Sequence, residues 1–153
     1  MNKLTLTIAG AAVLFATATP ALARDTVHIL PIEAAMNAND AKNRLGESVK
    51  FYFGNQKTPA IASRLGSDKT SQKTNSFGKD AETACHWAFL SSMLRLQARA
   101  QELGANAVVN IVSNYKNIER SSPTEYECHD GAIMTGVALK ADSSSSSKQD
   151  RPT

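Results

Sequence analysis

The feature that most restricts how this chain can fold is its only pair of cysteines, each followed directly by a histidine. Cys85 lies in "ETACHWAF" and Cys128 in "YECHDG". Such residues could hold a metal, act as reactive thiols or close a disulfide, which would tie the start of one element to a distant segment. The compartment helps to decide between these alternatives, because disulfides persist in oxidising environments.

The N-terminus has the pattern of a secretory signal peptide. Lys3 supplies a positive start, residues 4–18 are mostly apolar, and the small residues Ala21 and Ala23 complete a cleavage motif. The apolar run of about 15 residues is shorter than the roughly 20 that a membrane-spanning helix needs. We therefore expect residues 1–23 to be a signal peptide cut near Ala23, no membrane span, and a periplasmic or secreted protein.

In an exported chain the cysteines are best explained as a disulfide. Adjacent residues on a helix point about 100° apart, so Cys85 and His86 cannot easily hold one ion, and neither cysteine has the usual zinc spacing. A nucleophilic thiol needs a base close in space, which a neighbour in sequence does not indicate. We predict a Cys85–Cys128 disulfide that closes a loop of about 44 residues and stabilises the domain by roughly 4 kcal/mol. His86 and His129 are the alternative metal ligands.

Charge and motifs exclude several functional classes. The formal net charge of +3 falls by one when Lys3 leaves with the signal peptide, and a single tryptophan gives little basis for base stacking. In "RLGSDKT" Asp68 occupies the place of a glycine that a phosphate-binding loop needs. We expect no nucleic-acid partner, no cofactor, no catalytic residues and no enzymatic activity.

The segment from Asp80 to Gly104 predicts the longest helix, with Asp80 as its N-cap and Gly104 as its stop. Apolar and small residues recur there at steps of three and four, which predicts one buried stripe. The stripe consists of Ala81, Cys85, Ala88, Phe89, Ser92, Leu96, Ala100 and Leu103. Another side of the helix carries charged residues, namely Arg95, Arg99 and Glu102.

Four segments have strand composition or alternation: residues 26–32, 49–53, 107–115 and 132–140. A shorter helix is expected over Glu33–Leu45, with Gly46 as its C-terminal cap. The last two strands are apolar on both faces, so the second face must be covered by the first helix or by another subunit, giving a homo-oligomer through that face. Gly136 is expected at a bulge or at a close approach of a helix.

Two segments have the composition of loops. Residues 54–79 are rich in Gly, Ser, Thr, Asn and Lys, and they predict a long polar loop that could bind an anion. Residues 142–153 predict a disordered Ser-rich tail. The chain between the signal peptide and this tail, residues 24–141, is expected to be a single domain.

The segments "KTNSFGKDAETACHWAFLSSMLRLQARAQELGANAVVNIVSNYKN" and "YECHDGAIMTGVALKA" resemble a family of small exported bacterial proteins of unknown function. Its members often carry the label "excinuclease ATPase subunit", an activity that needs a Walker loop and zinc-binding cysteine pairs, which this sequence lacks. More distantly, "ELGANAVVNIVSNY" and "AIMTGVALK" are similar to the YbjQ-like family, described as heavy-metal-binding, and to the stress-sensing lipoprotein of the Rcs phosphorelay. In that lipoprotein, disulfides staple the domain.

The resemblance implies an α+β fold: a small, mostly antiparallel sheet, here of about four strands, with one long helix packed on it and a shorter N-terminal helix. It also implies a non-enzymatic exported domain for binding or for envelope-stress interaction. The partner would be an unknown envelope protein or a small anionic ligand. The alternative is a periplasmic heavy-metal-binding protein that uses His86 and His129.

Overall fold

The structure is a computed structural model in which residues 23–147 are described. The predicted signal peptide lies outside this range except for Ala23. Seven strands and three helices follow one another along the described chain. Their order is β1 (Thr26–Pro31), α1 (Ile32–Asn37), α2 (Ala41–Leu45), β2 (Lys50–Phe53), β3 (Ile61–Asn75), α3 (Ala81–Glu102), β4 (Ala107–Tyr115), β5 (Ile118–Arg120), β6 (Glu125–Asp130) and β7 (Met134–Ser146).

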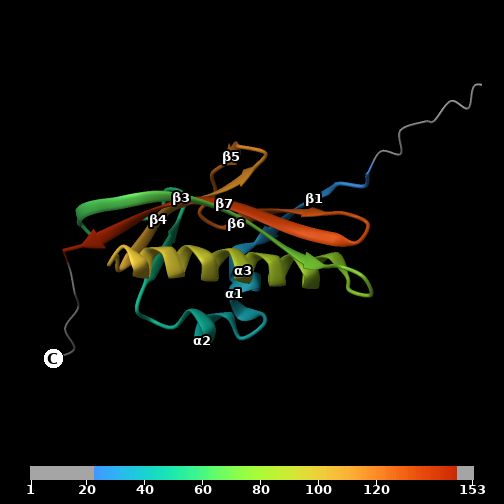
Figure 1. Ribbon diagram of the computed structural model, residues 1–153, viewed down its shortest axis with the longest axis horizontal. Coiled ribbons are helices and arrows are strands. Elements are labelled where there is room, and N and C mark those ends of the chain that lie inside the picture. The colour runs from blue at the N-terminus through green and yellow to red at the C-terminus, as the bar shows by residue number, and fades with distance from the viewer. Residues whose placement is uncertain (1–22, 148–153) are drawn as a thin grey trace, which may run out of the picture.

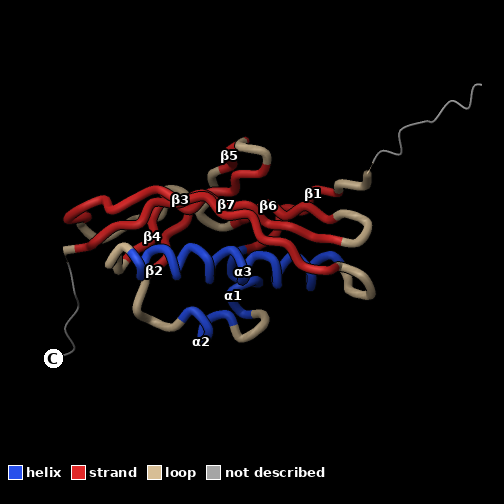
Figure 2. The backbone as a smooth tube through the Cα atoms, in the orientation of Figure 1, coloured by secondary structure: helices blue, strands red, loops and turns tan. Residues whose placement is uncertain are grey.

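The strands form one mixed sheet, so the predicted fold class is wrong: the sheet has seven strands rather than about four. Its hydrogen-bonded order is β1-β6-β7-β4-β2, while β3 pairs with β7 and β5 pairs with β4. All pairs are antiparallel except β2 with β4, which is parallel. Figure 2 shows the strands as one layer with the helices gathered on one side.

The largest difference lies in residues 54–79, where β3 replaces most of the predicted polar loop. This strand is 15 residues long and pairs with β7 from Asn75↔Met134 to Ile61↔Ser146. Backbone pairing does not require apolar side chains, and charged residues on an edge strand discourage pairing with other molecules. Lys69 and Lys73 therefore suit an edge strand, although their charge made the segment resemble a loop.

The predicted disordered tail is also partly strand, because β7 continues through Ser146. Ser143 and Ser144 are 3% and 0% exposed. They lie between β3 and β4 in the middle of the sheet, where Ser144 pairs with Ala107 on one side and Arg64 on the other. Residues 148–153 lie outside the described range.

Helix α3 covers one face of the sheet, and α1 and α2 lie on the far side of α3 (Figure 1). The helix begins as predicted, with the backbone N–H of Thr83 donating to the Asp80 side chain at 2.9 Å. It is buried on two sides rather than along one stripe: Ser92 Oγ donates to the Val137 carbonyl of β7, and Gln97 donates to the Leu45 carbonyl of α2.

The segment predicted as one N-terminal helix is split into α1 and α2, and it covers α3 instead of the second face of the sheet. The break lies at Asn39 and Asp40, both with positive φ. We call the sheet face opposite α3 the open face. Part of it lies beneath β5, whose Glu119 accepts a hydrogen bond from Lys140 of β7. Among the described residues, no helix combines the length and the apolar character that crossing a bilayer requires.

Candidate ligand-binding site

The disulfide determines how the residues of β6 are oriented. Cys85 of α3 and Cys128 of β6 are bonded, with a Cα–Cα distance of 5.9 Å, and both are fully buried. This confirms the predicted disulfide. Because successive side chains of a strand point to opposite faces, the neighbours of Cys128, Glu127 and His129, point to the open face.

His129 is bound by carboxylates on both sides. Its Nδ1 lies 2.7 Å from Asp25 Oδ1, its Nε2 lies 2.7 Å from Glu127 Oε1, and its ring stacks on Tyr115. Both ring nitrogens of His129 thus lie within hydrogen-bond distance of a carboxylate oxygen. The His129 side chain is only 10% exposed. It is therefore a packed residue of strand β6.

Asp25 connects this network to the start of the domain. Its Oδ2 accepts a hydrogen bond from the Tyr115 hydroxyl at 2.9 Å, and Lys116 Nζ lies 3.9 Å from the same oxygen. The hydrogen bonds from His129 and then from Tyr115 lower the pKa of Asp25. The same contact with Asp25 raises the pKa of Tyr115. Asp25 is thus held as a carboxylate whose oxygens are both engaged.

A pocket of about 330 Å³ opens beside this network. Its lining comes from four separate parts of the chain: Ala23, Arg24, Asp25, Lys73, Tyr115, Lys116, His129, Gly131 and Met134. Three of these residues are permanently cationic at neutral pH, and Asp25 is the one carboxylate among them. Since Asp25 already has its partners, the pocket presents net positive charge.

Lys73 reaches this pocket because Gly136 has no side chain. Val27, His129, Gly136 and Lys73 pair in register across β1, β6, β7 and β3. A Cβ added to Gly136 would lie 3.3 Å from Lys73 Cγ. The predicted close approach at Gly136 is therefore made by a lysine side chain and not by a helix. Among the described residues Lys73 has no ion-pair partner.

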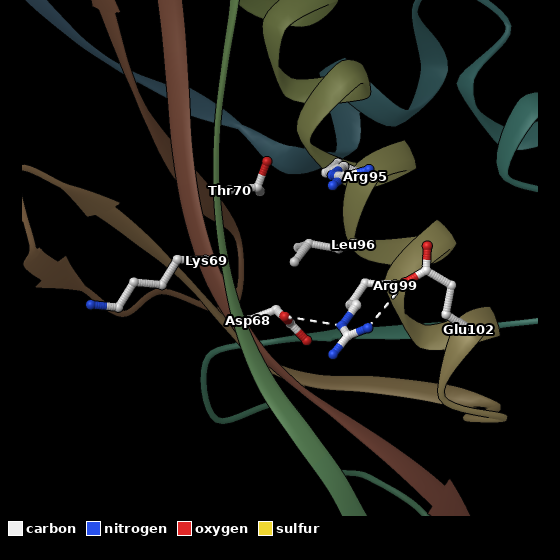
Figure 3. A pocket seen from close by; sticks show the side chains of 7 residues that line it. All are labelled: Asp68, Lys69, Thr70, Arg95, Leu96, Arg99 and Glu102. Atoms are coloured by element: carbon white, nitrogen blue, oxygen red, sulfur yellow. Dashed lines mark hydrogen bonds and ion pairs between the residues drawn. The ribbon is translucent and has the colours of Figure 1, made fainter.

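A second pocket of about 240 Å³ lies between β3 and α3 (Figure 3). There Arg99 contacts both Asp68, at 3.3 Å, and Glu102, at 3.0 Å. Figure 3 shows Lys69 pointing away from this pocket, and its Nζ donates to Asn117. Two arginines thus face two carboxylates, so the second pocket has balanced charge.

The alternative metal ligands are not brought together. His86 lies on α3, 3.8 Å from Glu82, whereas His129 faces the open side of the sheet. Both cysteine sulfurs are used by the disulfide. Within residues 23–147, no group of three or more His, Cys, Asp and Glu side chains is placed to hold a metal ion.

Most residues of the pocket carry no recognisable signal in the sequence. Asp25 is far along the chain from the adjacent residues Tyr115 and Lys116, and only the folded sheet joins them to His129. Lys73 was included in the predicted anion-binding segment, and this residue does line the cationic pocket. Comparisons with protein-family models, curated proteins and solved structures found nothing that matches this chain.

Proposed function

We propose that the protein is a non-enzymatic exported binding domain that takes a small anionic ligand in the pocket formed by Arg24, Lys73 and Lys116. The observation that carries the proposal is the unpaired ammonium of Lys73 in a pocket whose one lining carboxylate is already bonded. A ligand's carboxylate, phosphate or sulfate would supply the missing partner, because hydrogen bonds between ionised groups are about twice as strong as neutral ones.

The dimensions and the rigidity of the pocket support the same function. A volume of about 330 Å³ is at the lower end of the range for small-molecule sites, about 300–1,000 Å³. Four of its lining residues, Lys73, Tyr115, His129 and Met134, belong to strands, and the stacked rings of Tyr115 and His129 form one part of the wall. A wall that is partly fixed in this way reduces the ordering that a ligand must bring about when it binds. An envelope partner that recognises the occupied pocket would make the protein an envelope-stress interaction domain.

Isothermal titration calorimetry of the purified protein with inorganic phosphate and with succinate tests the proposal. We expect saturable binding of at least one anion, and Lys73→Gln should weaken it about tenfold, the effect of losing one charged hydrogen bond. Lys57→Gln is the matched control, because it removes the same charge from an exposed residue outside the pocket. Equal losses in the two variants, or no binding to the wild type, would refute a specific site.

A further inference from the structure

A second feature, at one end of the sheet, is not explained by the pocket. Three large apolar side chains are exposed there: Phe77 is 81% exposed, Ile133 65% and Met134 43%. Phe77 lies in the β3–α3 connection and the other two lie at the β6–β7 turn, which meet at the same end of the molecule (Figure 1). We call these three residues the apolar tip.

The exposure of the tip is built into the fold. The Phe77 N–H donates to the Asn75 side chain at 2.7 Å, and the Ser76 N–H donates to the Ile133 carbonyl at 3.0 Å, which ties the two loops together. Gly78 has a φ of 74°, a conformation that other residues adopt with strain. Hydrogen bonds therefore fix the backbone of the loop that carries Phe77, and the Phe77 side chain is left exposed. Apolar side chains that are exposed together in this way often mark an interaction site.

Basic residues lie beside the tip in the sequence and in the pocket that it borders. Lys79 follows Phe77 by two residues, and Lys73 and Arg24 line the pocket that Met134 also borders. Acidic groups on this side of the domain already have partners: Asp80 caps α3, Asp25 is bonded to His129 and Tyr115, and the buried Asp130 is bonded to Thr135 and Arg24. Exposed apolar side chains next to basic residues suit the surface of an anionic bilayer. There the apolar side chains enter the acyl boundary and the basic side chains contact the headgroups.

The tip also lies where the chain enters the domain. Ala23 and Arg24 border the same pocket as Met134. The expected signal peptide, with its apolar residues 4–18, precedes them directly. A signal peptide that is still uncleaved after the domain has folded would therefore hold this end of the domain nearest the membrane.

We propose that the apolar tip docks on the surface of an anionic phospholipid bilayer, with Phe77 and Ile133 entering the acyl boundary and Lys73 and Lys79 facing the headgroups. The proposal does not depend on a ligand in the pocket. A double substitution of Phe77→Ser and Ile133→Ser should abolish docking and leave anion binding in the pocket unchanged. Either proposal can therefore be refuted without affecting the other.

Co-sedimentation with vesicles tests the docking. The wild type should bind vesicles of equal parts phosphatidylglycerol and phosphatidylcholine, and bind pure phosphatidylcholine at least about tenfold more weakly. The Phe77→Ser/Ile133→Ser variant should lose about tenfold or more in affinity for the anionic vesicles. Ile118→Ser is the matched control, because Ile118 is 73% exposed on the β4–β5 hairpin, and it should bind as the wild type does.

A Phe77→Trp variant provides a second measurement that does not depend on how well the double variant folds. Its fluorescence emission should shift to shorter wavelength when anionic vesicles are added, because the indole leaves water. Three results would overturn the proposal: no sedimentation with anionic vesicles, equal binding by the double variant and the wild type, or no emission shift. A tip that serves to dock a protein would give the first and third of these.

Discussion

Cys128 and His129 are neighbours in β6, yet one is bonded to Cys85 beneath the sheet and the other stacks on Tyr115 above it. The disulfide therefore does more than join a helix to a strand. It fixes the face to which each residue of β6 points, since a shift by one residue would turn every side chain over. The candidate site on the open face thus depends on a covalent bond that lies on the other side of the sheet.

Removing the disulfide should destabilise the domain strongly. The bond joins residues 43 positions apart, and the chain-entropy model assigns such a loop about 4 kcal/mol. We expect the Cys85→Ala/Cys128→Ala variant to lose approximately that amount of unfolding free energy in urea titrations. Reductant should lower the unfolding free energy of the wild type and leave that of the variant unchanged. A wild type whose unfolding free energy is the same with and without reductant would contradict the prediction.

Gly136→Ala should impair the pocket more than the fold. Gly136 lies in a regular strand, where alanine is tolerated, so the unfolding free energy should change by no more than about 1 kcal/mol. The new methyl group would displace the Lys73 stem, whose Cγ lies 3.3 Å from the added Cβ. We expect weaker anion binding by calorimetry, and no further weakening when Gly136→Ala is added to Lys73→Gln. If the losses of anion-binding free energy in the two single variants add up in the double variant, Lys73 is not the residue that the new methyl group displaces.

Asp130 should contribute to stability above about pH 4. Its hydrogen bond from Thr135 and then its contact with Arg24 lower its pKa from 3.8. A carboxyl whose pKa is lower in the folded state stabilises the protein above its unfolded pKa and loses that contribution as pH falls through the folded value. Asp130→Asn should therefore be less stable than the wild type at pH 7. Urea midpoints at decreasing pH should converge below about pH 4, whereas a constant gap would contradict the assignment.

His129→Phe should keep the ring stacked on Tyr115 but lose both carboxylate partners. Asp25 and Glu127 would then each lose the hydrogen bond that they make with a ring nitrogen of His129. We expect a loss of about 1–3 kcal/mol in unfolding free energy. Adding Asp25→Asn should recover part of it, because one of the two carboxylates that lost a ring nitrogen is replaced by a neutral amide. No recovery would mean that the loss comes from packing and not from charge.

The sequence predicted those parts whose signals are local. The cap at Asp80 and the periodic helix that follows are present, β4 has the predicted bounds of 107–115, and the disulfide joins the predicted cysteines. Each of these predictions needed one signal that can be read directly from the sequence: the capping residue of the helix, the periodicity of its apolar residues, the apolar composition of the strand, or the expected export of the two cysteines. The first helix was found as a segment, but its break at Asn39 and Asp40 was not.

The parts that the sequence did not predict depend on pairing between distant segments. The polar β3 and the serines of β7 have little strand propensity of their own, and each is a strand because the other lies beside it. The pocket is even less predictable. Its residues Asp25, Lys73, Tyr115 and His129 come together only after β3, β4 and β6 have paired with β7, and β1 has paired with β6.

Strand β7 is the shared hydrogen-bonding partner of β3, β4 and β6, and it follows all three along the chain. The sheet cannot form completely until β7 has been synthesised, so the nascent chain lacks the central strand of its sheet for most of translation. On the proposal that the protein is exported, a central strand that is synthesised last would delay folding until the chain has crossed the membrane.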